Sequence, residues 1–396
     1  MRLAGLVQDI QQDSGKSTTR LAGSGKLLRF GGTRMEVDEL LKLMVDKGAS
    51  DLHLTVPSPP VLRIDGVLMP QEDLPPLAAK DIESAFEKIS TQEQRAAFGR
   101  EWELDFAYSV PGLARFRVSL LQQRGTMSLA FRLVPSNVPS IDELGLPQIC
   151  KQLVLKPRGL ILVTGSAGSG KSTTLAAMIN HLNENERRNV ITVEDPIEYL
   201  FHNKRCIIRQ RDLGDDTKSF SAALIHVLRH DPDVIIIGEM RDIDTISTAI
   251  TAAETGHLVL GTLHTVDAAQ SIDRIIDIFP PGQQRQMRLQ LSQVIEAVLS
   301  QTLLPRIRGG RVAAFEIMIA TYVVRRLIRE EKIYEIPANM ELGSREGMQT
   351  LDQALADLVR SGIVTQEEAV MKSSDSGKLN RLLQFQYPKE VTMIKQ

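Results

Sequence analysis

The stretch from Gly165 to Thr174 reads Gly-Ser-Ala-Gly-Ser-Gly-Lys-Ser-Thr-Thr, and it restricts the possible fold more than any other part of the chain. Its glycines allow the backbone to curl so that successive N–H groups point inward at phosphate oxygens. The apolar residues 160–164 before it predict a buried strand, and residues 175–179 after it predict a helix. A strand, a glycine-rich loop and a helix in this order predict a phosphate-binding loop in a parallel α/β sheet.

The side chains of this loop suit a nucleotide with a bound metal ion. Lys171 can reach the β and γ phosphates, and Ser172 can offer its hydroxyl to Mg²⁺. The helix that starts here adds the positive end of its dipole. We therefore expect ATP and Mg²⁺ as cofactors. The residues expected to contact the nucleotide are Gly165, Ser166, Ala167, Gly168, Ser169, Gly170, Lys171, Ser172 and Thr173.

Two further apolar runs end in carboxylates, where a parallel α/β sheet places its ligand crevice. Glu239 follows the run 234–237, and we expect it to orient the attacking water. Many phosphate-loop enzymes place an aspartate before this glutamate, whereas this chain has a glycine there. The expected metal ligands are therefore drawn from both strand ends: Ser172, Glu194, Asp195 and Glu239. Each carboxylate alone is more often a helix cap or a solvated loop residue, but their convergence in one phosphate-loop domain favours the site.

His264 ends another apolar run, residues 257–262, and two interpretations of it stay open. It could sense the γ phosphate and act with Glu239 and Glu194 as a catalytic residue. It could equally be a histidine that is only hydrogen-bonded within the fold.

The composition describes an ordinary soluble globular protein. Its 396 residues are 42% hydrophobic and 24% charged, which allows two or three domains with sizeable cores. Lys and Arg number 47 against 49 Asp and Glu, so no basic excess indicates nucleic acid. Cys150 and Cys206 stand far apart in the sequence, which argues against a disulfide framework and favours a reducing cytoplasm. No apolar run approaches 18 residues, so we expect membrane contact to be peripheral at most.

The pattern along the chain predicts two domains. Apolar residues at helical spacing from 37 to 45, followed by short strand-like runs between 51 and 133, indicate an α+β domain with an antiparallel sheet. A Pro/Ser-rich segment then separates it from the parallel α/β pattern. The expected divisions are a flexible tail at 1–34, the first domain at 35–135, a linker at 136–150, an ATPase core at 151–282, a mainly helical part at 283–386 and a second flexible tail at 387–396. Within the helical part, one apolar helix face is expected at Leu289, Leu291, Val294, Ile295, Val298 and Leu299.

The order of these motifs resembles that of the secretion ATPases of the type II/type IV pilus superfamily. The resemblance rests on the loop at 165–173, the acidic box 194–198, the run 228–242 and the segment ending at His264, and it covers roughly residues 35–385. Within the superfamily the chain is most similar to the pilus retraction ATPases of the PilT/PilU group. The resemblance implies a PAS-like N-terminal α+β domain, a RecA-like P-loop ATPase domain with a mainly helical C-terminal region, and a hexameric ring.

The same resemblance gives a meaning to four arginines of the first domain, since similar arginines in this family stabilise phosphate charge across a domain or subunit boundary. They are Arg115, Arg117, Arg124 and Arg132. A solvated sheet face is an equally good interpretation of each. The segment 323–330 reads Val-Val-Arg-Arg-Leu-Ile-Arg-Glu, where retraction ATPases have Ala-Ile-Arg-Asn-Leu-Ile-Arg-Glu, an element linked to retraction.

The resemblance therefore predicts a cytoplasmic homo-hexameric ATPase that drives type IV pilus retraction and twitching motility. Its expected partners are the inner-membrane pilus platform protein and other pilus machinery, reached from the inner face of the cell membrane, with no nucleic acid. Three alternatives stay open: a pilus assembly or type II secretion ATPase, a RecA-like nucleic-acid translocase, and an accessory scaffold that binds ATP without hydrolysing it.

Overall fold

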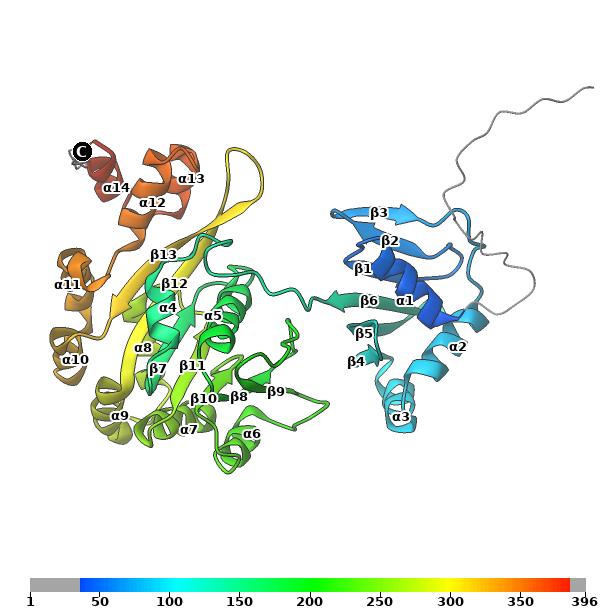
Figure 1. Cartoon of the computed structure of the whole chain (residues 1–396), viewed down its shortest axis with the longest axis horizontal. Helices are drawn as coiled ribbons and strands as arrows, with labels where there is room; N and C mark the ends of the chain where they lie inside the picture. The colour runs from blue at the N-terminus through cyan, green and yellow to red at the C-terminus, as the bar shows by residue number, and fades with distance from the viewer. Residues whose placement is uncertain (1–35, 385–396) are drawn as a thin grey trace, which may run out of the picture.

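A computed structural model describes residues 36–384, so the tails expected at 1–34 and 387–396 lie outside the described residues. The chain forms an N-terminal unit built on an antiparallel sheet and a larger unit built on a mainly parallel sheet. The two are joined by the segment after strand β6 (Figure 1). Within residues 36–384, no helix is both long and apolar enough to cross a lipid bilayer.

The sheet of the N-terminal unit has the strand order β3-β2-β1-β6-β5-β4, and all its pairs are antiparallel. Its strands are β1 (Asp51–Leu54), β2 (Val61–Ile64), β3 (Val67–Pro70), β4 (Glu103–Val110), β5 (Ala114–Gln123) and β6 (Thr126–Val134). Its helices are α1 (Val37–Asp46), α2 (Ala79–Ile89) and α3 (Gln92–Glu101).

The helical spacing at 37–45 correctly predicted α1, whose apolar residues Val37, Leu40, Leu41 and Met44 are buried. They pack with inward-facing strand residues such as Phe116 and Phe131 into the core of this unit. Helices α2 and α3 and the edge strand β3 were not predicted from the sequence. Every residue of β3 is exposed, so this strand lacks the alternation that identifies a half-buried one.

The sheet of the larger unit has the order β13-β12-β7-β11-β10-β8-β9. All neighbouring strands run parallel except β12 and β13, which are antiparallel. The strands are β7 (Gly159–Thr164), β8 (Asn189–Glu194), β9 (Ile207–Asp212), β10 (Val234–Ile237), β11 (Leu258–Leu263), β12 (Ile295–Pro305) and β13 (Arg311–Ile319).

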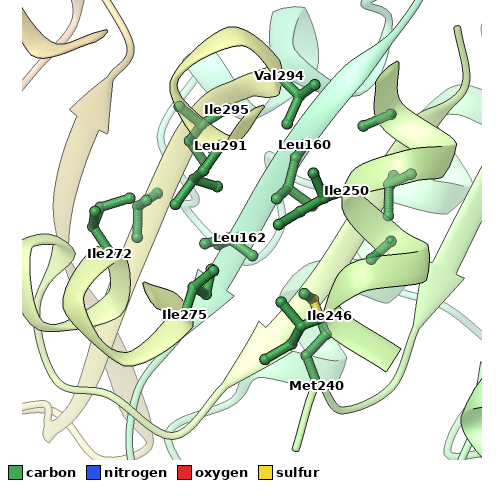
Figure 2. Packing of buried hydrophobic residues seen from close by; sticks show 14 of the residues in the cluster. Leu160, Leu162, Met240, Ile246, Ile250, Ile272, Ile275, Leu291, Val294 and Ile295 are labelled. Atoms are coloured by element: carbon green, nitrogen blue, oxygen red, sulfur yellow. The ribbon is translucent and has the colours of Figure 1, made fainter. Parts of the chain in front are cut away.

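Helices cover both faces of this sheet, which explains why its central strands are continuous apolar runs. Leu160 and Leu162 of β7 face one core, whereas Ile161 and Val163 face the other. Figure 2 shows the first core, where Leu160 and Leu162 meet Ile250 and Leu291 from the covering helices. The helices around the sheet are α4 (Ile149–Val154), α5 (Lys171–Asn185), α6 (Phe220–Val227), α7 (Ile243–Glu254), α8 (Ala268–Asp277) and α9 (Pro281–Val294).

The C-terminal region after β13 is helical, but the helical part starts later than we expected. The prediction of a mainly helical chain from residue 283 was wrong for 295–319, which form β12 and β13. The remaining elements are α10 (Tyr322–Arg329), the 3-10 turn η1 (Ile333–Glu335), α11 (Ile336–Leu342), the 3-10 turn η2 (Ser344–Glu346), α12 (Leu351–Arg360), α13 (Gln366–Lys372) and α14 (Ser376–Gln384).

The predicted helix face at 289–299 was also wrong. Helix α9 ends at Val294, and Ile295, Val298 and Leu299 belong to β12 beside β7. The helical spacing was misleading because the strand is buried on both faces and so shows no alternation.

The expected linker at 136–150 was too long. Ile141 and Leu146 are buried in the core of the larger unit, and α4 already begins at Ile149. Part of the segment that we predicted to be a linker therefore belongs to the packed core of the larger unit.

Two leucines of α9 provide a test of which residues of the predicted apolar face are buried. Leu291 is 0% exposed and packs on β7, whereas Leu289 is 44% exposed. We expect Leu291→Ala to lower the free energy of unfolding by about 2–5 kcal/mol, because it leaves a cavity. Leu289→Ala should change it by less than about 1 kcal/mol. Urea unfolding of both variants measures this, and equal losses would contradict the assignment.

Candidate functional site

The glycine-rich loop connects the end of β7 to the start of α5, as the sequence predicted. Gly165 has φ +143°, and a Cβ atom there would lie 2.3 Å from the carbonyl oxygen of Gln301. A side chain is therefore excluded at this position by both the backbone conformation and the contact. Lys171 Nζ donates hydrogen bonds to the carbonyl oxygens of Gly165 at 2.8 Å and Ser166 at 3.1 Å. The lysine thus lies folded along the loop at the positive end of α5.

Strand β12 supports this loop, a role that the sequence analysis missed because it predicted a helix there. Gln301 Nε2 donates to the carbonyl oxygen of Ser169 at 2.6 Å. Ser300 Oγ accepts a hydrogen bond from Thr164 Oγ1 at 2.8 Å, just before the loop. One feature of the sequence could have indicated this role: the polar run Ser300-Gln301-Thr302 within an apolar stretch. Buried polar groups of this kind require partners, and here the partners are the phosphate loop and its strand.

Glu239 lies directly after β10, next to His264 after β11. Its Oε1 is 3.0 Å from His264 Nε2, and its other oxygen accepts from Arg241 Nη2 at 2.5 Å. Burial alone would raise the pKa of Glu239, but the hydrogen bonds and charges of Arg241 and His264 outweigh it and lower the pKa. The carboxylate is therefore ionised at neutral pH and able to accept a hydrogen bond from water. Glu239 and His264 were predicted to share the site, and the structure brings them together.

Glu194 ends β8 in a more enclosed environment. Its Oε1 accepts from Thr192 Oγ1 at 2.6 Å and from Gln210 Nε2 at 3.1 Å. Burial raises the pKa of this carboxyl, and the two hydrogen bonds only partly oppose the effect. Two carboxylates at adjacent strand ends therefore have opposite shifts in pKa, a difference that suits separate chemical roles.

The glycine before Glu239 has a packing reason. A Cβ atom on Gly238 would lie 3.0 Å from Glu194 Cα and 3.1 Å from the carbonyl oxygen of Val193. These are backbone atoms of β8, whose strand end cannot move without displacing Glu194. The close approach of β10 to β8 therefore disfavours a side chain here, including the aspartate that many phosphate-loop enzymes have.

Glu198 is a site residue that the sequence analysis did not select. Ser172 Oγ, the predicted metal ligand, donates to Glu198 Oε1 at 2.9 Å. Asp195, the fourth predicted ligand, is exposed and lines the same cavity. Glu198 belongs to the acidic box 194–198, so its charge was visible in the sequence, but its contact with Ser172 depends on the fold.

The donor set fits Mg²⁺ bound together with a nucleotide. Within residues 36–384, no three His, Cys, Asp or Glu side chains converge as a ready-made metal site. Mg²⁺ usually takes one or two protein oxygens and completes its shell with phosphates and water. The hydroxyl of Ser172 with the nearby carboxylates offers such oxygen donors beside the loop.

A cavity of about 940 Å³ brings these groups together. It is lined by the loop residues Ala167, Gly168, Gly170, Lys171, Ser172 and Thr173, by Glu194, Asp195, Glu198, Glu239 and His264, and by Arg132 of the N-terminal unit. Of the other predicted loop residues, Gly165 and Ser169 are buried and Ser166 is exposed. The cavity is large enough for a nucleotide.

The four predicted arginines lie in different surroundings. Arg132 lines the cavity, and its Nε lies 2.8 Å from Asp51 Oδ1. Arg115 Nη2 lies 3.0 Å from Asp212 Oδ2 at the end of β9, so it joins the two units. Arg117 is exposed beside Arg132 in the sheet register. Arg124 lies in the turn between β5 and β6, at the opposite end of β6 from the linker.

The segment 323–330 forms most of α10, and its residues divide by burial. Leu327 and Ile328 are buried in the core, and Arg325 donates to the carbonyl oxygens of Ser292 and Gln293. These residues hold the helix against α9. Val323, Arg326 and Arg329 are exposed and form the surface available to a partner.

This chain is similar to known proteins of secretion and pilus systems. A family model described as Type II/IV secretion system protein matches residues 33–371. The chain is 47% identical over 339 residues to the type IV pilus retraction ATPase PilT of Pseudomonas aeruginosa, which covers 86% of this chain and 98% of the relative. It is 40% identical over 352 residues to the type IV pilus ATPase PilU of the same organism, covering 89% and 92% of the two chains.

A solved structure is similar over the same length. The crystal structure of the pilus retraction motor PilT with bound ADP has a TM-score of 0.82 and 44% identity, and the match covers 88% of this chain and 99% of that one. This similarity confirms the predicted fold, a PAS-like α+β domain followed by a RecA-like domain with a helical C-terminal region.

Glu194 makes a testable contribution to stability. Because its pKa in the folded chain is raised above the ordinary value of 4.5, the stability that protonated Glu194 gives is lost as pH rises. Glu194→Gln cannot ionise and keeps an acceptor oxygen for Thr192 and Gln210. We expect the urea midpoint of this variant to rise relative to that of the unsubstituted chain as the pH increases above about 4.5. A difference that stays constant over this range would exclude a raised pKa.

Proposed function

Because the chain belongs to the type II/IV secretion system protein family, we propose that it is a P-loop ATPase whose hydrolysis of ATP drives type IV pilus retraction and twitching motility. The single observation that carries this proposal is the cavity that joins the phosphate loop to Glu239 and to Arg132 of the N-terminal unit. The relatives named for pilus retraction match nearly their whole length, which supports the same output here.

In the proposed reaction, ATP binds with its β and γ phosphates against the loop. Lys171 leaves the carbonyl oxygens of Gly165 and Ser166 and pairs with phosphate oxygens instead. Ser172 and the carboxylates beside it would hold Mg²⁺, which would supply positive charge against the phosphates. Glu239, whose pKa is lowered by Arg241 and His264 despite burial, orients the attacking water. His264 fixes the position of Glu239 through the 3.0 Å contact and lies where it can respond to the γ phosphate.

Contacts between the two units offer a route from nucleotide to movement. Arg115 pairs with Asp212, and the Ala107 N–H donates to Asp215 Oδ2 at 3.1 Å. Both acceptors lie at or just after the end of β9, whose neighbour β8 carries Glu194. A shift of Glu194 on binding would therefore reach the N-terminal unit through few contacts.

We propose that six copies form a ring in the cytoplasm. In such a ring, Arg117 and Arg124, which are exposed in the single chain, face the nucleotide of the adjacent copy. Arg132 acts at the cavity of its own chain, and Arg115 holds the two units of that chain together. The proposed partner is the platform protein of the pilus machine at the inner face of the cell membrane. The surface of α10 with Val323, Arg326 and Arg329 is a candidate for transmitting force to it. We do not propose a nucleic-acid substrate.

Two substitutions separate binding from hydrolysis. Lys171→Ala should weaken ATP binding at least about tenfold, because it removes the positive charge that faces the phosphates. Glu239→Gln should retain binding but lower turnover about 100-fold or more, because the amide orients and deprotonates water poorly. Nucleotide titrations and phosphate release measure both effects. Glu87→Gln, an exposed substitution in α2, is the control.

The same Glu239→Gln variant tests the biological output. Imaging of pili in a deletion strain complemented with this variant should show surplus pili that persist, because assembly continues without disassembly. Absent pili would instead indicate an assembly ATPase. Unchanged hydrolysis in purified Glu239→Gln and Lys171→Ala proteins would contradict the active-site assignment itself.

A further inference from the structure

The N-terminal unit has a second cavity that the proposed ATPase function does not use. It is a groove of about 710 Å³ between α2, α3 and the strands β5 and β6. Its floor is formed by Phe86 and Phe98, which are 3% and 5% exposed and stack edge to face at 5.5 Å. Trp102 and Met127 form its apolar walls. The groove shares no lining residue with the nucleotide cavity.

Trp102 is held in an unusual way. It caps α3 with φ +60°, a left-handed conformation that glycine usually supplies at this place. Its N–H donates to the Phe98 carbonyl oxygen at 2.9 Å, and its own carbonyl oxygen accepts from the Gln122 N–H at 3.0 Å. The backbone is thus fixed on both sides while the residue stays 67% exposed. A strained, exposed aromatic residue beside an apolar floor is typical of a binding surface.

The rim of the groove is acidic. Its two carboxylates, Glu83 and Glu87, are exposed along α2. Arg95 also lines the groove, but its Nη1 donates to the carbonyl oxygens of Glu87 and Ser90 at the end of α2. The chemistry of the groove therefore favours a peptide that combines apolar and basic side chains.

Such a peptide precedes the described residues in this chain. Residues 26–35 read Lys-Leu-Leu-Arg-Phe-Gly-Gly-Thr-Arg-Met, with four apolar side chains and three basic ones. The first 35 residues together contain six Lys or Arg and two Asp. Because the family match begins at residue 33, most of this peptide lies outside what the chain shares with the family.

The point of attachment places this peptide within reach of the groove. Glu36, the first described residue, pairs with Lys88 of α2 at 2.5 Å, and Glu87 beside it lines the groove. From Lys88 to Glu83 the helix rises only about 8 Å. The nine residues from Leu27 to Glu36 can span about 30 Å when extended.

We propose that residues 26–35 bind in this groove of the same chain, with their apolar side chains against Phe86, Phe98 and Trp102 and their basic side chains at the acidic rim. This contact fixes the N-terminal segment on the first domain. It is independent of the proposed ATPase function, since neither nucleotide binding nor hydrolysis requires it.

The experiment uses the fluorescence of Trp102, because the chain contains a single tryptophan. The triple variant Leu27→Asp, Leu28→Asp, Phe30→Asp is made in the full-length chain. Burying aspartates among aromatic rings is unfavourable, so the segment should leave the groove and expose Trp102 to water. We therefore expect the emission to shift to longer wavelength and acrylamide quenching to rise about twofold. The matched control Leu3→Asp, Leu6→Asp, Val7→Asp adds the same charge to the same segment and should leave both readings unchanged.

A second variant approaches the contact from the groove. Glu83→Lys with Glu87→Lys should give the same rise in quenching, because it replaces attraction of the basic peptide by repulsion. Identical fluorescence in the unsubstituted chain and the 27/28/30 variant would overturn the proposal. So would a dependence of fluorescence on protein concentration that the unsubstituted chain shows and the 27/28/30 variant does not, because it would indicate that the segment binds to another copy.

Discussion

The close approach of the backbone at Gly165 to the carbonyl oxygen of Gln301 is the constraint on which the nucleotide site depends. A side chain at Gly165 would meet this oxygen at 2.3 Å, so β12 and the phosphate loop can only pack with glycine at this position. The same glutamine donates to the carbonyl oxygen of Ser169 and so supports the loop at a second point. The loop is therefore held by a strand about 130 residues further along the chain, at two separate points.

A similar close packing determines the electrostatics of the strand ends. Gly238 lets β10 approach β8, which places Glu239 and Glu194 at the same edge of the sheet. Their environments differ, because Arg241 and His264 lower the pKa of Glu239 whereas burial raises the pKa of Glu194. The first carboxylate is suited to orienting water. The second is enclosed, and the neighbouring strand β9 connects it to the N-terminal unit.

The sequence predicted the local parts of this site and missed the long-range ones. The loop, Glu239 and His264 were identified because each follows a strand whose apolar run is visible on its own. Strand β12 was mistaken for a helix because burial on both faces removes the alternation of a strand, and the support from Gln301 was lost with it. Glu198 was visible as a charge, but its hydrogen bond to Ser172 depends on the path of the chain after β8. Leu327 and Ile328 matched a family element, and only the fold shows that they are core residues.

The most direct test of the account replaces the supporting glutamine and measures nucleotide affinity. Gln301→Met keeps the volume of the side chain but removes the hydrogen bond to Ser169, and Gln286→Met on the exposed face of α9 is the control. Loss of a buried hydrogen bond of this kind costs about 1–3 kcal/mol, so we expect the affinity for ADP to fall about tenfold or more in the first variant only. An unchanged ADP affinity in a folded Gln301→Met protein would show that β12 does not hold the loop in its binding conformation.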